Sequence, residues 1–385
     1  MLTSAIAVLS LTVWLILLGG RGRFWLCRER DDRTTPPPPA RWPRVTAVVP
    51  ARNEAECIAE SIGSLARQDY PGPFAIVLVD DDSDDGTADI ARRAGAALPE
   101  DRSLRIVASR GLAPGWTGKL WALKQGVDAA RAAPEPPDYL LLTDADIVHS
   151  TDSVRALVAR AESGGYVLTS LMAELRCESW AERCHIPAFV FFFQMLFPFA
   201  WVNTPARRTA AAAGGCMLAR ADALERAGGI ESIRGALIDD CSLAARMKAT
   251  GPIWLGLTRR VRSIRRYDWS DIRQMIARSA YAQLRYSPML LAATTFGMTL
   301  TYLAGPLLAL SGEGTARALG ALTWALMTLA FQPMLRFYRL SPWWGLAMPA
   351  IALAYMLYTL DSAYRHARGA GGYWKGRVQA NASNP

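Results

Sequence analysis

FAIVLVDDDSDDGTADIARRAGA, residues 74–96, joins an apolar run to a cluster of aspartates and then to a helical pattern. The apolar residues 74–79 predict a strand that is buried on both faces, and the residues from Gly86 onward have the periodicity of a helix. Between them, five aspartates occupy the six positions 80–85, although the chain has a formal net charge of +9. The stretch therefore predicts a strand–loop–helix unit with an acidic loop at the carboxyl end of the strand.

The same alternation of strand and helix continues on both sides of this unit. Apolar runs at 45–49, 104–108 and 139–142 predict further strands, and EAECIAESIGSLARQ and GKLWALKQGVDAARAA predict helices between them. Continuous apolar strands separated by helices are typical of a parallel sheet with helices on both faces, because parallel strands need crossover connections. The sequence therefore predicts an α/β fold with a mostly parallel, Rossmann-like sheet.

Polar residues follow three of these predicted strands. They are Pro50, Arg52, Asn53 and Glu54 after the first strand, the aspartates after the second, and Thr143, Asp144 and Asp146 after the fourth. Ligands of such sheets bind at the carboxyl ends of the strands. A solvated loop would explain any one of the three clusters, but a shared site explains all of them.

Several familiar nucleotide or metal sites do not fit the sequence. Aligning Gly86 with the turn glycine of a calcium loop places Arg92 at the twelfth position, where a bidentate Glu is needed. The chain has no G-x-x-x-x-G-K-[ST] loop, and no G-x-G-x-x-G follows the first strand. These absences disfavour an EF-hand, an ATPase of the P-loop type and a dinucleotide-binding enzyme.

Two further stretches suit a diphosphate and a cation. Asp144-Ala145-Asp146 places two carboxylates at a strand end, and Mg²⁺ sites commonly combine one or two carboxylates with phosphate oxygens. GWTGKLWAL (115–123) places Lys119 at the start of a predicted helix, where amides and a lysine favour anions. Taken singly, each stretch is also compatible with an ordinary capped loop.

Together these motifs resemble a known family. VPARNEAE, LVDDDSDDGTADIA, LLLTDAD and GALIDDCSLAARMKATG, in this order, resemble the inverting nucleotide-sugar glycosyltransferases of family 2, which have the GT-A fold. AGGCMLARADALERAGGI (213–230) is similar to the segment before the catalytic acidic motif of those enzymes, so the resemblance covers about residues 45–260. More narrowly, GWTGKLWAL, RSAYAQLRYSP, the WKGR tail and the apolar ends resemble the hopanoid-biosynthesis-associated membrane glycosyltransferases of bacteria.

The resemblance implies roles for individual residues. It implies a general base at Asp240, with Asp239 beside it, and Mg²⁺ or Mn²⁺ held by Asp146 and Asp144. Within the nucleotide site, it places Asp81 on the uracil ring and Asp144 near the ribose. The implied nucleotide-binding residues are Pro50, Arg52, Asn53, Glu54, Asp81, Lys119 and Asp144.

The sequence departs from the family pattern at two points. The catalytic motif begins with Asp239 where the family usually has Glu, which leaves the role of that residue open. The Q-x-x-R-W motif of processive relatives is absent, and MIARS (275–279) stands in its place, so Arg278 is the candidate for a diphosphate or acceptor contact. The missing tryptophan argues against a synthase of long polymers.

Apolar segments at both ends of the chain predict membrane helices. Residues 1–20 carry no charge and are long enough to span a bilayer, and four arginines follow within ten residues. Charge after the span favours an uncleaved anchor whose C-terminal side is cytoplasmic. Three late stretches, 290–310, 318–335 and 343–360, are also free of charged residues. The sequence leaves open whether two or three of these stretches span the membrane, because three spans would place the basic tail on the non-cytoplasmic side. The stretch 290–310, with Gly305 and Pro306, is expected to be the least regular helix of the three.

Two further segments suit the membrane surface. Residues 186–202 are uncharged and aromatic-rich, which fits a helix lying in the interface or a helix of the core. Residues 259–286 carry eight arginines interleaved with aromatics. Beside membrane spans, anionic lipid headgroups are better partners for such a segment than nucleic acid.

We therefore expect a bacterial inner-membrane, multi-pass enzyme with its catalytic domain in the cytoplasm. The expected activity is inverting transfer of a sugar from a nucleotide-sugar, a UDP-sugar by the resemblance, to a membrane lipid hydroxyl such as that of a hopanoid. Inversion needs a base for the acceptor and a cation for the departing diphosphate. Alternatives are a polyprenyl-phosphate, glycerolipid or sphingolipid acceptor, or a non-catalytic nucleotide-sugar-binding protein.

The expected segments are an anchor (1–20), a basic, proline-rich linker (21–44), a GT-A domain (45–260), a basic amphipathic interfacial segment (261–286), transmembrane helices (287–360) and a basic tail (361–385).

Overall fold

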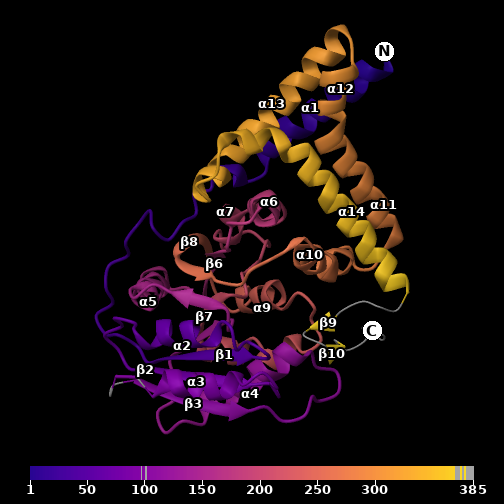
Figure 1. The fold of residues 1–385 in the computed structure, drawn as a ribbon. Helices are drawn as coiled ribbons and strands as arrows, with labels where there is room; N and C mark the ends of the chain where they lie inside the picture. Colours follow the sequence, from indigo (N-terminus) through magenta and orange to yellow (C-terminus); the bar gives the residue numbers. More distant parts are fainter. Residues whose placement is uncertain (97, 100–101, 369–372, 375–376, 379–385) are drawn as a thin grey trace. The chain divides into compact units, whose positions relative to one another are not determined.

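The computed structural model describes residues 1–96, 98–99, 102–368, 373–374 and 377–378. Most of the expected basic tail, including Lys375, lies outside the described residues. The chain forms two compact units (Figure 1). The sheet unit comprises residues 29–176, 201–265 and 372–385, and the helical unit comprises residues 1–28, 177–200 and 266–371.

The sheet unit is built on one eight-stranded sheet in the order β3-β2-β1-β4-β7-β6-β8-β5. The strands β3, β2, β1 and β4 are parallel neighbours, as the apolar runs predict. The remaining strands are joined by antiparallel pairs and by the parallel pair β6–β8. Their bounds are β1 (Val45–Ala51), β2 (Phe74–Asp80), β3 (Arg102–Ala108), β4 (Tyr139–Thr143), β5 (Ile147–His149), β6 (Leu168–Glu174), β7 (Cys216–Arg220) and β8 (Ile253–Ser263).

Helices cover both faces of this sheet. Ile58 and Ile62 of α2 belong to the same buried cluster as Val49 of β1, whereas Gly126 of α4 faces Val48, the next residue of the strand. A methyl group on Gly126 would lie 2.4 Å from the Val48 side chain, so this glycine permits close helix–strand packing. The helices of the sheet unit are α2 (Ile58–Ala66), α3 (Thr87–Gly95), α4 (Gly118–Arg131), α5 (Ser153–Gly164), α8 (Ala221–Arg226), the short η2 (Ile230–Ile233) and α9 (Asp239–Lys248).

Two details of the sheet unit differ from the sequence prediction. Pro50 lies inside β1 and is buried, rather than following the strand. β4 pairs with β1 only as far as Val48, so the missing N–H of Pro50 removes no bond of the sheet. In the linker, Arg30 bridges to Leu257 of β8, and Asp31 accepts a hydrogen bond from Thr258. This part of the predicted spacer is therefore fixed to the sheet.

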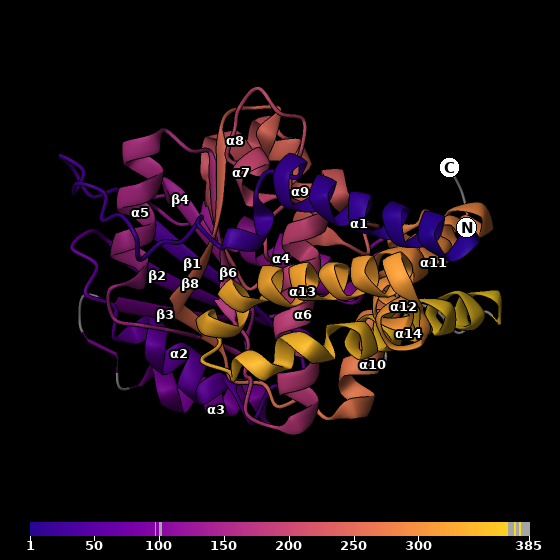
Figure 2. The ribbon, with the colours of Figure 1, turned by 90° about the horizontal axis from the view of Figure 1, so that it is seen from above.

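The helical unit contains the long apolar helices. They are α1 (Leu2–Gly20), α11 (Pro288–Met298), α12 (Gly305–Ser311), α13 (Gly314–Phe337) and α14 (Met348–Ala367), together with α6 (Trp180–Leu196) and α10 (Trp269–Gln283). Its shorter turns are η1 (Phe24–Leu26), η3 (Thr299–Ala304) and η4 (Pro342–Ala347). Along the chain, the division between the units falls within α7 (Phe199–Val202). In the sheet unit, β9 (Tyr373–Trp374) pairs with β10 (Arg377–Val378). Helices α1 and α13 run side by side (Figures 1 and 2).

The stretch 290–310 is irregular, as its glycine and proline predict. Helices α11 and α12 are joined by the π-helical η3, directly before Pro306. In a π-helix the amide of residue 306 would bond the carbonyl of Thr301, but proline has no N–H. The buried Trp14 fills this gap, since its Nε1 donates to the Thr301 carbonyl over 2.8 Å. Ser10 likewise bonds the Leu300 carbonyl, so α1 satisfies backbone groups that a membrane interior could not.

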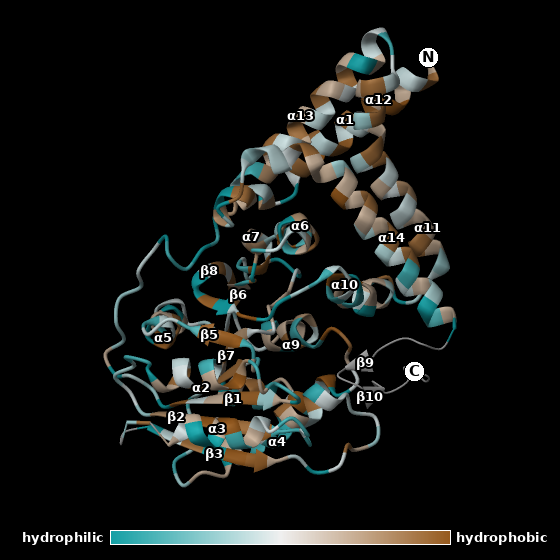
Figure 3. Cartoon of the chain, in the orientation of Figure 1, coloured by the Kyte–Doolittle hydropathy of each residue, from teal (hydrophilic) through white to brown (hydrophobic). Residues whose placement is uncertain are grey.

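Among the described residues, four helices have the length and composition to cross a membrane: Leu2–Gly20, Pro288–Ser311, Gly314–Phe337 and Pro342–Ala367. Hydrophobic residues run along each of them (Figure 3). Large apolar side chains such as Ile16, Phe296 and Leu329 are more than half exposed, and a lipid environment would cover them. The stretch 186–202 is divided between α6 and α7, with Pro198 between the two helices.

Candidate active site

The acidic loop 80–85 is bound to the segment that follows β1. The Ser83 hydroxyl accepts a hydrogen bond from the Asn53 amide over 3.0 Å, and the Thr87 hydroxyl accepts one from the Glu54 amide over 2.8 Å. Asp85 accepts a hydrogen bond from the amide of Thr87, the first residue of α3, over 3.0 Å. Two of the three predicted polar clusters are thus one connected structure.

Asp81 is the fully buried member of the acidic run. The Arg52 guanidinium donates to the carbonyls of Asp81 and Asp82, and its Nη1 lies 3.9 Å from Oδ2 of Asp81. Asn53 and Asp82 have φ angles of 50° and 59°, a left-handed conformation that non-glycine residues adopt at an energetic cost. The two loops after β1 and β2 thus form one strained, hydrogen-bonded surface at the carboxyl edge of the sheet.

Lys119 connects the third polar cluster to the catalytic motif that the sequence predicts. Its Nζ lies 2.9 Å from Oδ1 of Asp144 and 3.3 Å from Oδ2 of Asp239. Burial alone would lower the pKa of the ammonium, but the two carboxylates raise it above its usual value. Lys119 is therefore a permanent cation between the end of β4 and the start of α9.

Asp240 is held by two backbone amides. Oδ2 accepts from the Gly214 amide over 3.0 Å, and Oδ1 accepts from the Cys241 amide over 2.7 Å. Burial, together with the neighbouring charge of Asp239, raises the pKa of Asp240 to about 6. A carboxylate with such a pKa is suited to accept a proton near neutral pH.

Asp146 is held by residues that follow it by more than a hundred positions. Its Oδ2 accepts hydrogen bonds from Ser263 Oγ over 2.9 Å and from Arg265 Nε over 3.1 Å. The Nη2 of Arg265 also donates to both carboxylate oxygens of Glu54, over 2.6 and 2.7 Å. Arg265 therefore joins the segment after β1 to the carboxylate pair after β4.

These contacts form a chain of charged side chains along the carboxyl edge of the sheet, in which each cation lies between two carboxylates. Beginning at the segment after β1 and ending at the start of α9, its members are Glu54, Arg265, Asp146, Asp144, Lys119, Asp239 and Asp240. Five carboxylates and two cations leave a net negative charge in this chain. Such an edge can attract a cation, and it can offer a base beside that cation.

A buried histidine supports the loop that carries Asp144 and Asp146. Nε2 of His149 lies 3.0 Å from the hydroxyl of Thr143, and Nδ1 lies 3.3 Å from that of Ser153. Thr143 donates in turn to the carbonyl of Gly215, next to the glycine whose amide holds Asp240. Burial lowers the pKa of His149 to about 4, so the ring is neutral at pH 7.

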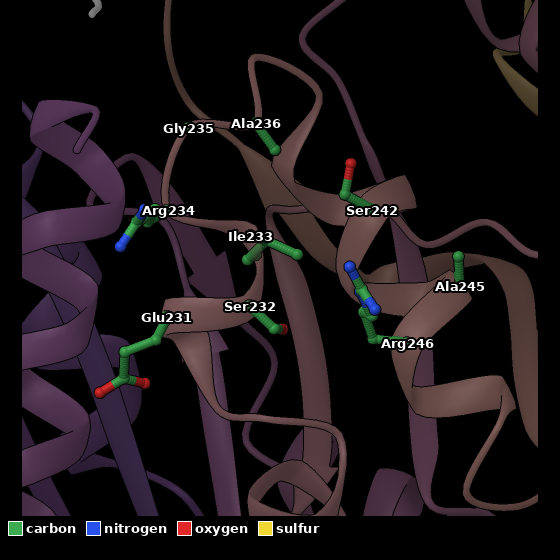
Figure 4. Close-up of a pocket in the computed structure, with 9 residues that line it drawn as sticks. All are labelled: Glu231, Ser232, Ile233, Arg234, Gly235, Ala236, Ser242, Ala245 and Arg246. Carbon is green, nitrogen blue, oxygen red and sulfur yellow. The ribbon is translucent and has the colours of Figure 1, made fainter. Parts of the chain in front are cut away.

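A pocket of about 580 Å³ opens beside α9 (Figure 4). Ser242, Ala245 and Arg246 line it from the helix, and residues 231–236 line it from the opposite side. Ser242 and Arg246 lie three and seven positions after Asp239, so they share a helix face with that carboxylate. The pocket therefore lies along the helix that begins at Asp239.

The structure brings most of the predicted site residues to one edge of the sheet. Arg52, Asn53, Glu54 and Asp81 lie at one end of this edge, and Lys119, Asp144, Asp146, Asp239 and Asp240 lie at the other. Lys119 pairs with carboxylates of the catalytic end, whereas the resemblance places it at the nucleoside. Pro50 contributes only to β1, and Arg278 is an exposed residue of α10 in the helical unit.

Arg265, Ser263 and Gly214 are candidate site residues that the sequence prediction missed. Arg265 stands among the arginines expected to face lipid headgroups, but it pairs with Glu54 and Asp146. Two other members of that group also pair within the sheet unit, Arg260 with Asp152 and Arg262 with Glu60. The only sequence signal for Arg265 was its position shortly after an apolar strand, which does not reveal a partner 211 residues away.

The chain matches two family models, and proteins of several bacteria are similar to it. Glycosyl transferase family 2 matches residues 46–228, and Glycosyl transferase family group 2 matches residues 139–359. An N-acetylglucosaminyltransferase of Rhizobium leguminosarum bv. viciae is 28% identical over 47% of this chain and 41% of its own length. An undecaprenyl-phosphate 4-deoxy-4-formamido-L-arabinose transferase of Pseudomonas aeruginosa is 26% identical over 75% of this chain and 74% of its own. This chain spans 34–41% of the length of the first three curated relatives.

A solved structure shares the fold. The mannosyltransferase PcManGT of Pyrobaculum calidifontis, in complex with GDP-Man and Mn²⁺, aligns with a TM-score of 0.57 and 22% identity. The alignment covers 93% of this chain and 99% of the other. The α/β fold with a mostly parallel sheet is thus of the GT-A type, as the sequence predicts. Because the second family model covers more than half of the 385 residues, the chain belongs to Glycosyl transferase family group 2.

Proposed function

We propose that this protein transfers a sugar from a UDP-sugar to a hydroxyl group of a membrane lipid, with inversion at the sugar carbon. The observation that carries the proposal is the charge chain at the sheet edge. It places the amide-held Asp240 beside Lys119 and the carboxylate pair Asp144 and Asp146. A base for an acceptor and carboxylates for a cation on a diphosphate are what such a transfer requires.

The donor would bind along the loops that follow β1, β2 and β4. In this proposal the buried Asp81 recognises the uracil ring, Arg52 and Asn53 shape the nucleoside pocket, and Asp144 lies near the ribose. The assignment of uridine rests on the family resemblance. GDP is the first alternative, since the mannosyltransferase of similar fold was solved with GDP-Man.

Asp146 fits a divalent cation such as Mg²⁺ or Mn²⁺. The described residues hold no group of three or more His, Cys, Asp or Glu side chains arranged for a metal, but a cation on a diphosphate needs only one or two carboxylates. The two hydrogen bonds to the Asp146 carboxylate both use Oδ2, which leaves Oδ1 to face a cation. When bound, the cation supplies charge that stabilises the departing diphosphate.

Asp240 would act as the base. It accepts the proton of the acceptor hydroxyl while the acceptor oxygen forms a bond to the sugar carbon and the bond from that carbon to the diphosphate breaks. The amides of Gly214 and Cys241 fix the orientation of its carboxylate, and its raised pKa suits a proton acceptor near neutral pH. The pocket beside α9 has room for part of the sugar or of the acceptor.

The acceptor is proposed to be a lipid because of the apolar helices. Four helices can cross a membrane by length and composition, and the arginines after α1 favour a cytoplasmic catalytic domain. The proposed location is therefore the bacterial inner membrane. A hopanoid alcohol is the acceptor that the narrower sequence resemblance supports.

A polyprenyl phosphate is the second candidate acceptor. It is favoured by the undecaprenyl-phosphate transferase of Pseudomonas aeruginosa, which aligns with three quarters of this chain. A phosphate oxygen is already ionised near neutral pH and needs little help from a base. An Asp240→Asn variant that keeps near-normal transfer would therefore favour this second acceptor.

The donor site can be tested by calorimetry. The protein is purified in detergent, and UDP and GDP are titrated with and without Mn²⁺. We expect UDP to bind in the presence of Mn²⁺, and we expect Asp146→Ala to abolish that binding. Asp89→Ala, which removes an exposed aspartate of α3, is the matched control. If neither nucleotide binds to the folded protein with or without Mn²⁺, the proposed function is wrong; if only GDP binds, the uridine assignment alone is wrong.

A further inference from the structure

Arg265 occupies the position that a cation would take between two carboxylates. Its Nη2 donates to both oxygens of Glu54, and its Nε donates to Oδ2 of Asp146. The amide of Ile264 bonds the Asp146 carbonyl over 3.0 Å, which fixes the backbone next to Arg265 against the loop that carries Asp146. The guanidinium is therefore held at Asp146 by its own backbone as well as by its charge.

The three side chains differ in their exposure to solvent. The carboxylate side chains of Glu54 and Asp146 are only 10% and 11% exposed, whereas the Arg265 side chain is 32% exposed. The Arg265 guanidinium is thus the member of the trio with the most access to solvent. With Arg265 in place the trio carries a net charge of −1; without it, the two buried carboxylates would carry −2.

We propose that Arg265 is a built-in counter-ion that competes with the divalent cation for Asp146. It makes metal binding depend on the donor diphosphate. This inference rests on the proposed function, because Asp146 is assigned to the metal there. A metal ion alone must approach Oδ1 of Asp146 against the charge of the guanidinium on Oδ2. A nucleotide diphosphate adds negative charge and oxygen ligands on the same side, so the pair binds where the ion alone binds poorly.

Two properties of the chain follow from this arrangement. In the donor-free protein Arg265 offsets one of the two negative charges, which limits the repulsion between buried acids at the sheet edge. Binding of metal and donor becomes coupled, since the diphosphate supplies negative charge that offsets the repulsion between the metal ion and Arg265. Removing the positive charge of Arg265 should therefore strengthen the binding of the metal ion alone. It should also reduce the extent to which nucleotide tightens metal binding.

The test is a titration of Mn²⁺ alone, followed by electron paramagnetic resonance as loss of the free Mn²⁺ signal. It uses the full-length wild-type protein in detergent beside Arg265→Gln and Arg265→Lys. Arg262→Gln is the matched control, because Arg262 lies on β8, is 61% exposed and pairs with Glu60 outside the site. Thermal melting and gel filtration establish that each variant is folded.

We expect Arg265→Gln to bind Mn²⁺ alone about tenfold more tightly than the wild type, a lower bound set by repulsion between a divalent ion and a nearby guanidinium even in water. Arg265→Lys, which keeps the charge, and Arg262→Gln should bind Mn²⁺ as the wild type does. Saturating UDP should tighten Mn²⁺ binding in the wild type more than in Arg265→Gln.

The inference is overturned if Arg265→Gln binds Mn²⁺ alone no more tightly than the wild type, or if wild-type Mn²⁺ affinity is high and unchanged by nucleotide. Should Arg265→Gln fail to fold, Arg265→Met and the nucleotide dependence of the wild type decide in its place. The proposed function fails separately, when neither UDP nor GDP binds with Mn²⁺. A protein that binds the nucleotide with Mn²⁺ but shows no gain in Arg265→Gln keeps the proposed function and loses this inference.

Discussion

Nζ of Lys119 lies 2.9 Å from Oδ1 of Asp144. The two residues come from different elements, the start of α4 and the loop after β4, and the same Nζ lies 3.3 Å from Asp239 at the start of α9. One ammonium group therefore sets the spacing between the carboxylates proposed for the donor and the motif proposed for the base. Without it, two acids of like charge would face each other at low exposure.

Replacing Lys119 should harm both stability and donor binding. Lys119→Met leaves Asp144 and Asp239 without their shared cation, and we expect the free energy of unfolding to fall by about 2 kcal/mol. Lys124→Met is the matched control, because Lys124 lies on the same helix, is similarly buried and also bridges two acids. Melting temperature and UDP–Mn²⁺ affinity are measured for both. Equal losses of nucleotide affinity in the two variants would contradict a specific role of Lys119.

Asp240→Asn should abolish transfer to a hydroxyl acceptor while it leaves the donor site intact. Loss of a general base typically lowers the rate by about 10²–10⁴-fold. Because the carboxylate is disfavoured by burial and by Asp239, the amide should not destabilise the protein. The assay follows labelled sugar from the UDP-sugar into extracted lipids, with UDP–Mn²⁺ affinity as the control. Asp239→Asn should retain more activity than Asp240→Asn; the reverse order would assign the base to Asp239.

The pH dependence of transfer should follow the Asp240 carboxylate. Its pKa of about 6 lies above the usual 3.8, and only the ionised form accepts a proton. The rate should therefore rise with pH up to about 6 and level off above it. Rates are compared at saturating donor across pH 5 to 8, roughly the range in which a shifted carboxylate of this kind titrates. A rate that is independent of pH below the expected pKa would exclude Asp240 as the base.

Four strands of the fold could be predicted because each contains its own signal. β1, β2 and β4 are continuous apolar runs, and a run buried on both faces is visible in the sequence without knowledge of its neighbours; β3 is an edge strand with a shorter apolar stretch. Once these strands were predicted to be parallel, the acidic loop and Asp144–Asp146 could be placed at one edge of the sheet, because parallel strands end on the same side. The short β5 and the antiparallel β7 depend on partners far along the chain, so no local pattern predicted them.

Contacts between distant residues account for what could not be predicted. Glu54 and Arg265 are separated by 211 positions, and nothing near either residue indicates that they meet. Lys119 could be recognised as a helix-start cation, but its partners were fixed only when α4, β4 and α9 were brought together. Pro50 is the opposite case, because its local pattern argues against a strand. β4 pairs with β1 only as far as Val48, so a proline at position 50 can still lie within β1.

His149 should make the protein less stable in mild acid. Its pKa is about 4 in the folded protein and 6.5 when unperturbed, so the unfolded chain binds the proton more readily. Stability is therefore complete above the unfolded pKa and is lost as pH falls from 6.5 towards 4, by up to about 3 kcal/mol. Melting curves between pH 7.5 and 4.5 should show a smaller acid dependence for His149→Gln than for the wild type. Identical slopes would show that other groups determine the acid sensitivity.

A bulky side chain in the pocket beside α9 should separate donor binding from transfer. Ala245 lines this pocket and is exposed, so Ala245→Trp fills the space without creating a clash in the core. If part of the sugar or acceptor lies there, transfer should fall by at least about tenfold, because a misplaced substrate loses its alignment with the base. UDP–Mn²⁺ affinity should stay unchanged, since the proposed nucleoside contacts lie at the opposite end of the charge chain. The control is Ala249→Trp, at the end of the same helix and absent from the pocket lining. Full activity of Ala245→Trp would show that neither substrate enters this pocket during transfer.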